Sequence, residues 1–162
     1  MRALAEACAD EEIARWIDSI PHPYTERDAR AFLAVSRRGW REGTLAAFAV
    51  SRTAGDDILG GIGIHVIEAE QAVAEIGYWV KREARRQGAA TRAVRIASRW
   101  ALEECEAERL QLRADVRNVA SQRVAERAGF TREGVLRSSR YSDRQHRRVD
   151  FVIFSLLPDE LQ

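Results

Sequence analysis

Residues 73–96 read VAEIGYWVKREARRQGAATRAVRI, and the fold prediction starts from this strand, loop and helix. Residues 73–80 are rich in β-branched and aromatic side chains, which is typical of a strand. Residues 89–106 repeat apolar side chains at helical spacing, so we expect a helix there. Gly88 stands at the start of that helix. Free N–H groups and a partial positive charge at a helix N-terminus attract anions, so the sequence predicts an anion site at this loop.

The expected anion site differs from the common phosphate-binding loops. It has neither the Gly-Lys-Ser/Thr ending of a Walker loop nor the G-x-G-x-x-G pattern of a dinucleotide fold. Gly88 would let a phosphate approach the backbone, and Arg85 and Arg86 would add positive charge. A plain turn before a helix is the alternative interpretation of the same residues.

Hydrophobic periodicity predicts the remaining elements. Further helices are expected at 10–19, 25–38 and 119–128, and further strands at 44–51, 58–67, 109–116, 130–140 and 149–157. A turn, TAGDD, is expected at 53–57 between the first two strands. This order predicts one α/β (α+β) domain over residues 1–162, with about four helices on a single mixed, mostly antiparallel sheet of about six to seven strands.

Composition narrows the classes of function. Apolar residues make up 46% of the chain and charged residues 31%, which is typical of a globular domain. No apolar run has the roughly 20 residues of a membrane span, and the beginning lacks the apolar core of an export signal. Cys8 and Cys105 have no zinc-site spacing. We therefore expect a cytoplasmic protein with no metal and no membrane partner.

Positive charge is concentrated in one part of the chain. Residues 81–148 contain 18 basic and 9 acidic side chains, whereas residues 1–80 contain 8 and 13. Such a field suits a phosphorylated cofactor or a nucleic acid. The basic residues lack interleaved aromatic side chains, so a nucleic-acid partner is the weaker expectation.

Two motifs together resemble one family. Arg85, Gly88 and Ala90 match the pyrophosphate-loop pattern Q/R-x-x-G-x-G/A. About 20 residues after the stretch that ends at Val94, a second segment begins at Leu112. In it Asn118, Ser121 and the pair Gly129–Phe130 match a second signature in order and spacing. The chain thus resembles the GNAT acetyltransferase family, and within it the RimJ/RimL-type protein acetyltransferases. The resemblance extends over about residues 10–160.

The resemblance implies a GNAT fold, whose sheet splays at an acetyl-CoA site. It places the pantetheine along the strand that ends at Val80 and the pyrophosphate on the amides of residues 86–91, with Asn118 and Ser121 toward the thiol end. The residues expected to contact acetyl-CoA are Tyr78, Trp79, Val80, Arg85, Arg86, Gln87, Gly88, Ala89, Ala90, Thr91, Asn118 and Ser121.

The chain departs from the family pattern at three places. Arg86 stands where the loop usually has a glycine, and Ala125 stands where many members have a tyrosine that protonates the coenzyme A thiolate. The first family strand has no counterpart before the first expected helix. A missing strand leaves a sheet edge exposed, so we expect another chain to cover it, as in a homodimer.

Three residues are candidates for catalysis. Glu75 alternates with Gly77 and Trp79 on one face of its strand, and is the expected general base, acting through a water. A carboxylate among apolar neighbours gives up its proton less readily than in water, which suits this task. Ser121 is the expected proton donor to the thiolate. Tyr141, on a loop between the last two strands, is a second acid or substrate contact. A solvated Glu75 and a merely packing Ser121 are the alternatives.

The resemblance, together with these residues, implies an acetyl-CoA-dependent N-acetyltransferase that moves an acetyl group to a primary amine by direct attack in a ternary complex. The acceptor is a protein N-terminus or a small-molecule amine, and segments 18–30 and 138–148 are expected to select it. A catalytically degenerate acyl-CoA sensor and a basic nucleic-acid-binding module are the alternative functions.

Overall fold

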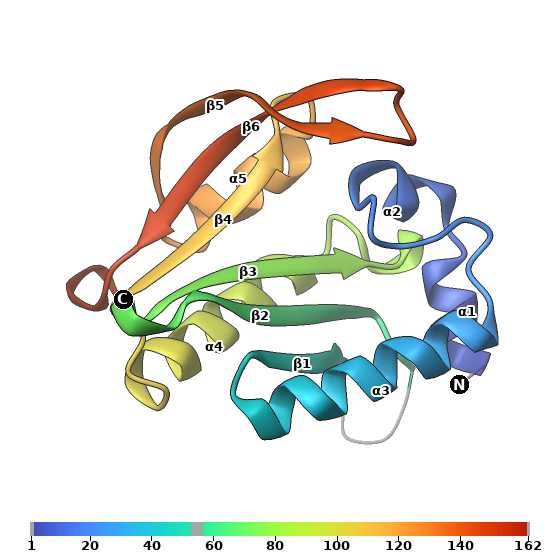
Figure 1. Ribbon diagram of the computed structural model, residues 1–162, viewed down its shortest axis with the longest axis horizontal. Helices are drawn as coiled ribbons and strands as arrows, with labels where there is room; N and C mark the ends of the chain where they lie inside the picture. Colours follow the sequence, from blue (N-terminus) through green and yellow to red (C-terminus); the bar gives the residue numbers. More distant parts are fainter. Residues whose placement is uncertain (1, 53–56, 162) are drawn as a thin grey trace.

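The computed structural model describes residues 2–52 and 57–161, and within these ranges helices cover both faces of one sheet (Figure 1). The helices are α1 (Arg2–Cys8), α2 (Glu11–Trp16), α3 (Glu26–Glu42), α4 (Ala89–Glu103) and α5 (Val119–Arg127). The strands are β1 (Leu45–Val50), β2 (Gly60–Glu68), β3 (Val73–Val80), β4 (Arg109–Asp115), β5 (Thr131–Ser142) and β6 (Arg147–Leu156). Short 3-10 turns follow β2, β3 and β6.

Most expected elements are confirmed, with shifted ends. β3 has the expected bounds, and Gly88 caps α4 as expected. α3 begins with a capping box between Thr25 and Asp28 and continues to Glu42, because Gly43 then takes the left-handed conformation that ends a helix. α1 was not expected, so the described part of the chain has five α-helices instead of about four. The turn expected at 53–57 lies mostly outside the described residues.

The sheet has the order β1-β2-β3-β4-β6-β5. All neighbouring strands run antiparallel except β3 and β4. These two pair only through Val73–Glu75 and Arg109–Gln111, so their later residues are free of each other. The expected splay of the sheet is therefore confirmed, and it begins directly after Glu75.

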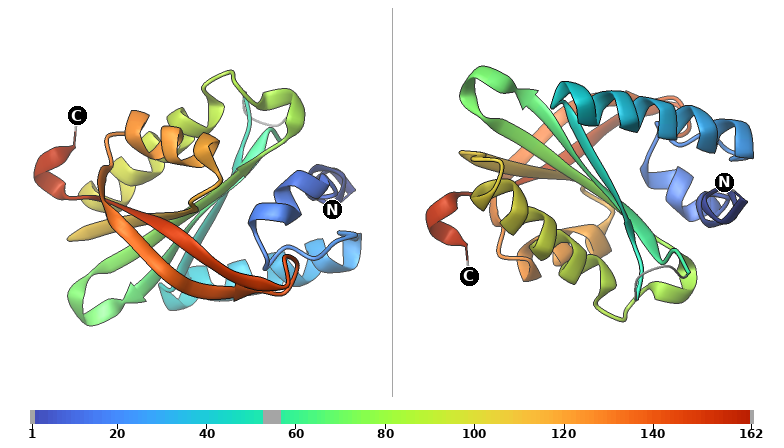
Figure 2. Two further views of the ribbon diagram at one scale, coloured as in Figure 1. Left: turned by 90° about the horizontal axis from the view of Figure 1, so that it is seen from above. Right: turned by 90° about the horizontal axis from the view of Figure 1, so that it is seen from below.

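The main core lies under α4 and α5. Ile62, Ile76, Leu112 and Phe154 project from four strands into one buried cluster with Val94 of α4. Figure 2 shows α4 and α5 on this face of the sheet, and α1, α2 and α3 on the opposite face. The first face is therefore closed by large side chains, while the second is covered by the N-terminal helices.

In the described residues before β1 the structure has helices and no strand, as the sequence predicted. β1 therefore forms one edge of the sheet. α3 packs along it, and Trp40 of α3 stacks on Trp100 of α4 with Phe48 edge-on to both. The homodimer expected at this edge stays a prediction. Among the described helices, none has the length and apolar character to cross a membrane.

Candidate active site

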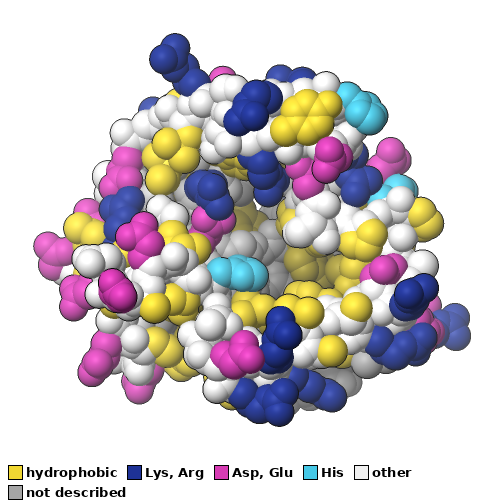
Figure 3. Space-filling view, viewed as in Figure 1, with side chains coloured by type: hydrophobic (Ala, Val, Ile, Leu, Met, Phe, Trp, Pro, Cys, Tyr) yellow, Lys and Arg dark blue, Asp and Glu magenta, His cyan; other side chains and the backbone are white. Residues whose placement is uncertain are grey.

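A large cavity opens where β3 and β4 diverge, and Figure 3 shows the hollow on this face of the molecule. Its volume is about 1780 Å³. Most ligand pockets hold roughly 300–1,000 Å³, so this one has room for two ligands at once. Of the expected cofactor residues, those that line it are Tyr78, Trp79, Val80, Arg85, Arg86, Gly88, Ala89, Ala90, Thr91, Asn118 and Ser121.

The start of α4 forms one end of the cavity. Gly88 is in the left-handed region, with a φ of 75°, and precedes the first helical residue, Ala89. The first hydrogen bond of the helical pattern is donated by the Arg92 N–H to the Gly88 carbonyl at 3.0 Å. The N–H groups of the residues before Arg92 therefore have no acceptor within the helix. They line the cavity beside Arg86, which is the arrangement that binds an anion.

Arg85 points its guanidinium at the N-terminal segment. It donates to Asp10 and to Glu12, each at 2.6 Å. Burial raises the pKa of the Asp10 carboxyl, but the backbone N–H of Glu12 and the Arg85 charge outweigh it, and the pKa lies below its ordinary value. Arg85 therefore ties the anion-binding loop to the start of α2. Its contact with a cofactor stays a prediction.

Gln87 supports the loop from outside the cavity. Its amide accepts from Arg52 at 3.0 Å and donates to the carbonyl of Glu83. It is not among the residues that line the cavity. Gln87 thus stabilises the loop through hydrogen bonds. Nothing in the geometry supports its expected contact with the cofactor.

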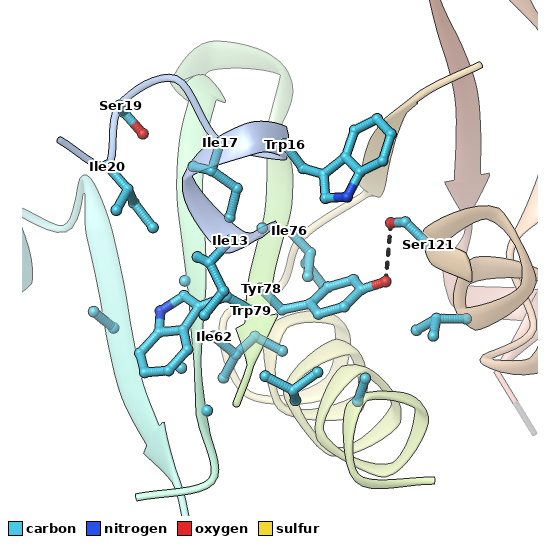
Figure 4. A pocket seen from close by; sticks show the side chains of 18 of the residues that line it. Ile13, Trp16, Ile17, Ser19, Ile20, Ile62, Ile76, Tyr78, Trp79 and Ser121 are labelled. Carbon is cyan, nitrogen blue, oxygen red and sulfur yellow. Dashed lines mark hydrogen bonds between the residues drawn. The ribbon is translucent and has the colours of Figure 1, made fainter. Parts of the chain in front are cut away.

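Asn118 and Ser121 organise the first turn of α5. The Asn118 side chain caps the helix by accepting from the Ser121 N–H at 3.1 Å. The Ser121 hydroxyl then shares a hydrogen bond of 2.9 Å with the Tyr78 phenol, which crosses the opening between β3 and α5 (Figure 4). Burial raises the pKa of Tyr78 to about 12, against the smaller opposing effect of Ser121. The phenol therefore keeps its proton at neutral pH.

Sequence reasoning missed this pairing of hydroxyls. Tyr78 was expected only as a cofactor contact, and Ser121 was expected to donate the proton without a tyrosine beside it, since position 125 carries an alanine. Ala125 is fully buried in the core there. Tyr78 lies three residues after Glu75, so the two side chains project from opposite faces of β3. This alternation along the strand was the feature of the sequence that could have assigned the two side chains to different tasks.

Glu75 lies at the last paired position before the splay. Arg113 donates from its Nε to the Glu75 carboxylate at 2.7 Å, and the Glu75 side chain is 22% exposed. His65 is directly opposite on β2. The expectation of apolar neighbours was therefore wrong, because the parallel register places an arginine from β4 beside the carboxylate. The ion pair fixes the direction of this candidate base.

The other end of the cavity is closed by α2 and the loop after it. Ile13, Ile17 and Ile20 lie over Trp79 in the close view (Figure 4). The β5–β6 hairpin supports this loop from behind: Ser142 donates to Asp18 at 2.9 Å, and Arg144 donates to the Ile20 carbonyl at 2.9 Å. The structure thus brings the segments 18–30 and 138–148 into contact.

Tyr141 does not join the other candidates. It was expected on a loop, but it lies inside β5, where it pairs with Arg148, because the strand continues to Ser142. Its side chain is half exposed and lies outside the cavity lining. Over residues 2–52 and 57–161, no group of three or more metal-ligating side chains is placed to hold an ion.

Comparisons with known proteins agree with this geometry. The family model described as an acetyltransferase (GNAT) domain matches residues 1–131. YdaF of Bacillus subtilis (strain 168) is 38% identical over 103 residues, which cover 64% of this chain and 55% of that protein. The ribosomal-protein-serine acetyltransferase of Escherichia coli (strain K12) is 31% identical over 53% of this chain and 48% of its own length. The matched stretches thus span about half of these relatives.

The fold agrees over nearly the whole chain. RimJ of Mycobacterium smegmatis, solved with CoA-disulfide, has a TM-score of 0.85 at 20% identity, covering 98% of this chain and 77% of its own. The chain belongs to the GNAT acetyltransferase family, in its RimJ/RimL-like branch.

Proposed function

We propose that this protein is an acetyl-CoA-dependent N-acetyltransferase that moves an acetyl group to a primary amine while both substrates are bound. One observation carries the proposal. The anion-binding start of α4 and the carboxylate of Glu75 open into the same cavity, on either side of the point where β3 leaves β4. A phosphate-bearing donor and an amine can therefore meet at the splay.

The cofactor end fits acetyl-CoA. The N–H groups of residues 88–91 and the Arg86 guanidinium would hold the pyrophosphate. Beyond Glu75, β3 has a free edge toward β4, so its backbone groups can bind the amides of the pantetheine. RimJ of M. smegmatis was solved with CoA-disulfide, and the microcin C7 immunity protein MccE, with a TM-score of 0.81, was solved with acetyl-CoA and AMP.

Acetyl-CoA supplies the acetyl group as a thioester. Glu75 takes a proton from the acceptor, directly or through a water, because an α-amine with a pKa near 8 is mostly protonated at neutral pH. The freed lone pair attacks the thioester carbonyl, and backbone N–H groups of β3 donate to its oxygen. The C–S bond then breaks. The attacking nitrogen gives its second proton to water, and Ser121, with Tyr78 behind it, delivers a proton to the departing sulfur and regains one from water.

The acceptor is proposed only as a primary amine. The E. coli relative is named for a ribosomal protein, which supports a protein N-terminus. A small-molecule amine fits the same cavity. An acyl-CoA sensor would bind acetyl-CoA and transfer nothing.

Glu75→Gln tests the proposal. We expect acetyl-CoA affinity by calorimetry to stay as in the parent, because the anion site is remote from residue 75. Thiol release with an amine should fall by roughly 10²–10⁴, the usual contribution of a positioned base. Glu103→Gln, on the exposed end of α4, is the matched control and should leave both quantities unchanged.

Three results would contradict the proposal. An unchanged rate of thiol release for Glu75→Gln at pH 6.5 would show that Glu75 is not the general base. Acetyl-CoA binding by the parent without thiol release across an amine panel identifies a sensor. Salt-sensitive RNA binding without acetyl-CoA affinity identifies a nucleic-acid module.

A further inference from the structure

Gly77 has no structural reason to be a glycine. It lies in the middle of β3, and a Cβ built on it meets nothing within 4 Å. Its φ is outside the left-handed region that favours glycine. Glycine weakens a strand interior, and where the protein itself does not need one, it marks the close approach of another molecule. Gly77 lines the cavity and is exposed there.

Gly77 belongs to a wider flat surface. Gly63 is directly opposite it on β2, and Gly61 is opposite Trp79. Because paired and alternate positions share a face, these three residues lie together on one face of the sheet, and we call them the glycine floor (Gly61, Gly63 and Gly77). A Cβ at Gly63 would lie 3.3 Å from the His65 imidazole, so the floor is open at Gly77 and bordered by His65 at Gly63. A Cβ at Gly61 would lie 2.7 Å from the Trp79 indole nitrogen, so that ring lies against the floor.

The two ends of the glycine floor differ in polarity. Trp79 closes one end, and Ile13 and Ile17 line the same cavity on the side of α2 (Figure 4). Glu75 closes the other end, on the same face as Gly77 and two residues away, which is about 7 Å along a strand. A ligand on the floor thus meets the Glu75 carboxylate beside the His65 imidazole at one end, and the Trp79 ring with Ile13 and Ile17 at the other.

We infer that the glycine floor seats a bulky apolar side chain carried next to the acceptor's amine. The inference rests on the proposed acetyl transfer and adds the substrate class. An α-amine at Glu75 places the side chain of its own residue over Gly77 and Gly63, between Trp79 and Ile17. A phenylalanine or leucine side chain buries apolar surface there, whereas a serine leaves the floor and the indole in contact with water.

Amino-acid amides are the probes that test this substrate class. With the parent protein, kcat/KM for phenylalanine amide should exceed that for serine amide by about tenfold or more. A Phe-headed tetrapeptide tested beside phenylalanine amide distinguishes a protein N-terminus from a small molecule. Acetylation of either the tetrapeptide or the amide supports the inference.

Gly77→Val tests the floor itself. The kcat/KM for phenylalanine amide should fall by about 10- to 100-fold, because the new methyl groups displace the amine from Glu75. Acetyl-CoA affinity should stay within about twofold, because the side chain of residue 77 points away from the face that carries Tyr78. The melting temperature should not fall. Gly134→Val in β5 is the control, since a Cβ there also meets nothing within 4 Å, and it should change none of these quantities.

The outcomes separate the two proposals. A parent that transfers acetyl but prefers serine amide, or a Gly77→Val variant with unchanged kcat/KM, overturns the inference and leaves acetyl transfer standing. A large loss of acetyl-CoA affinity in Gly77→Val also overturns it, since Gly77 would then serve the cofactor. A parent that acetylates no amine overturns the proposed function and this inference with it.

Discussion

The two ends of the cavity are built in different ways. The end proposed for the cofactor consists of the start of α4, the capped first turn of α5 and the free edge of β3, and it offers mainly backbone N–H groups. The end proposed for the acceptor consists of the glycine floor, Glu75 and the isoleucines of the N-terminal segment, and it depends on side chains from distant parts of the chain. Arg85 joins the two ends.

This difference shows which half tolerates change. Backbone donors remain when side chains are replaced, so the cofactor end is sensitive mainly to residues that block the loop or alter its backbone. The acceptor end changes shape with each substitution on its walls. We therefore expect substitutions on these walls to change which acceptor is used and to leave the donor unchanged.

Gly88→Asp should have the largest effect, at the cofactor end. The carboxylate opposes the pyrophosphate, and a side chain is strained at the φ of 75° found there. We expect calorimetry to show a loss of about 100-fold or more in acetyl-CoA affinity. Gly88→Asn is the matched control, because it has the same shape without the charge and tolerates this φ better. Equal affinities for Gly88→Asp and the parent would remove the loop from the site.

Tyr78→Phe tests the hydroxyl pair that lies between the two ends. If the phenol supports proton delivery from Ser121, kcat should fall by about 10- to 100-fold with little change in acetyl-CoA affinity. Stopped-flow measurement of thiol release gives this rate. Ser121→Ala should have a similar effect, and the double variant should lose little more, because the two hydroxyls act together. Fully additive losses would show that they act separately.

The Asp10→Asn/Glu12→Gln variant releases Arg85 from the N-terminal segment. The ion pairs are partly exposed, so we expect only about a three- to tenfold rise in the acceptor's KM, as α2 loses its tie to the loop. Acetyl-CoA affinity should stay equal or improve, because Arg85 becomes free to approach the pyrophosphate. A higher acetyl-CoA KM with an unchanged acceptor KM would contradict this division of the cavity.

The smallest expected effect is on stability in acid. Burial raises the pKa of Asp115, but the side chain and backbone N–H of Arg117 outweigh it and lower that pKa below its ordinary value. Such a carboxylate stabilises the fold above the unfolded pKa near 3.9, and this stability is lost as pH falls through the lower folded value. The slope from one group is at most about 1.4 kcal/mol per pH unit.

Chemical denaturation between pH 2 and 5 measures this slope. Asp115→Asn should reduce the pH dependence, whereas Asp159→Asn, on an exposed turn, serves as the control. A steeper slope in Asp115→Asn than in the parent would contradict the sign of the pKa change.

The sequence by itself determined the order of the elements after α1, the glycine at the start of α4 and the cap of α5. These features depend on neighbouring residues: Gly88 and Asn118 act within a few positions of themselves, and local periodicity specifies the strands and helices around them. The two family motifs lie in such local segments, which explains why all but Gln87 of the residues predicted to bind the cofactor line one cavity, while their contact with a cofactor stays a prediction.

Only the tertiary structure decided the neighbours of the catalytic candidates. Arg113 is 38 positions from Glu75, Ser121 is 43 from Tyr78, and Asp10 is 75 from Arg85. The Glu75–Arg113 pair depends on strand register, and a shift of one residue would turn its side chains to the other face of the sheet. The other two pairs depend on how the helices and loops pack against the sheet. Local sequence patterns do not specify that register, so the ion pair at Glu75 and the glycine floor became visible only in the folded chain.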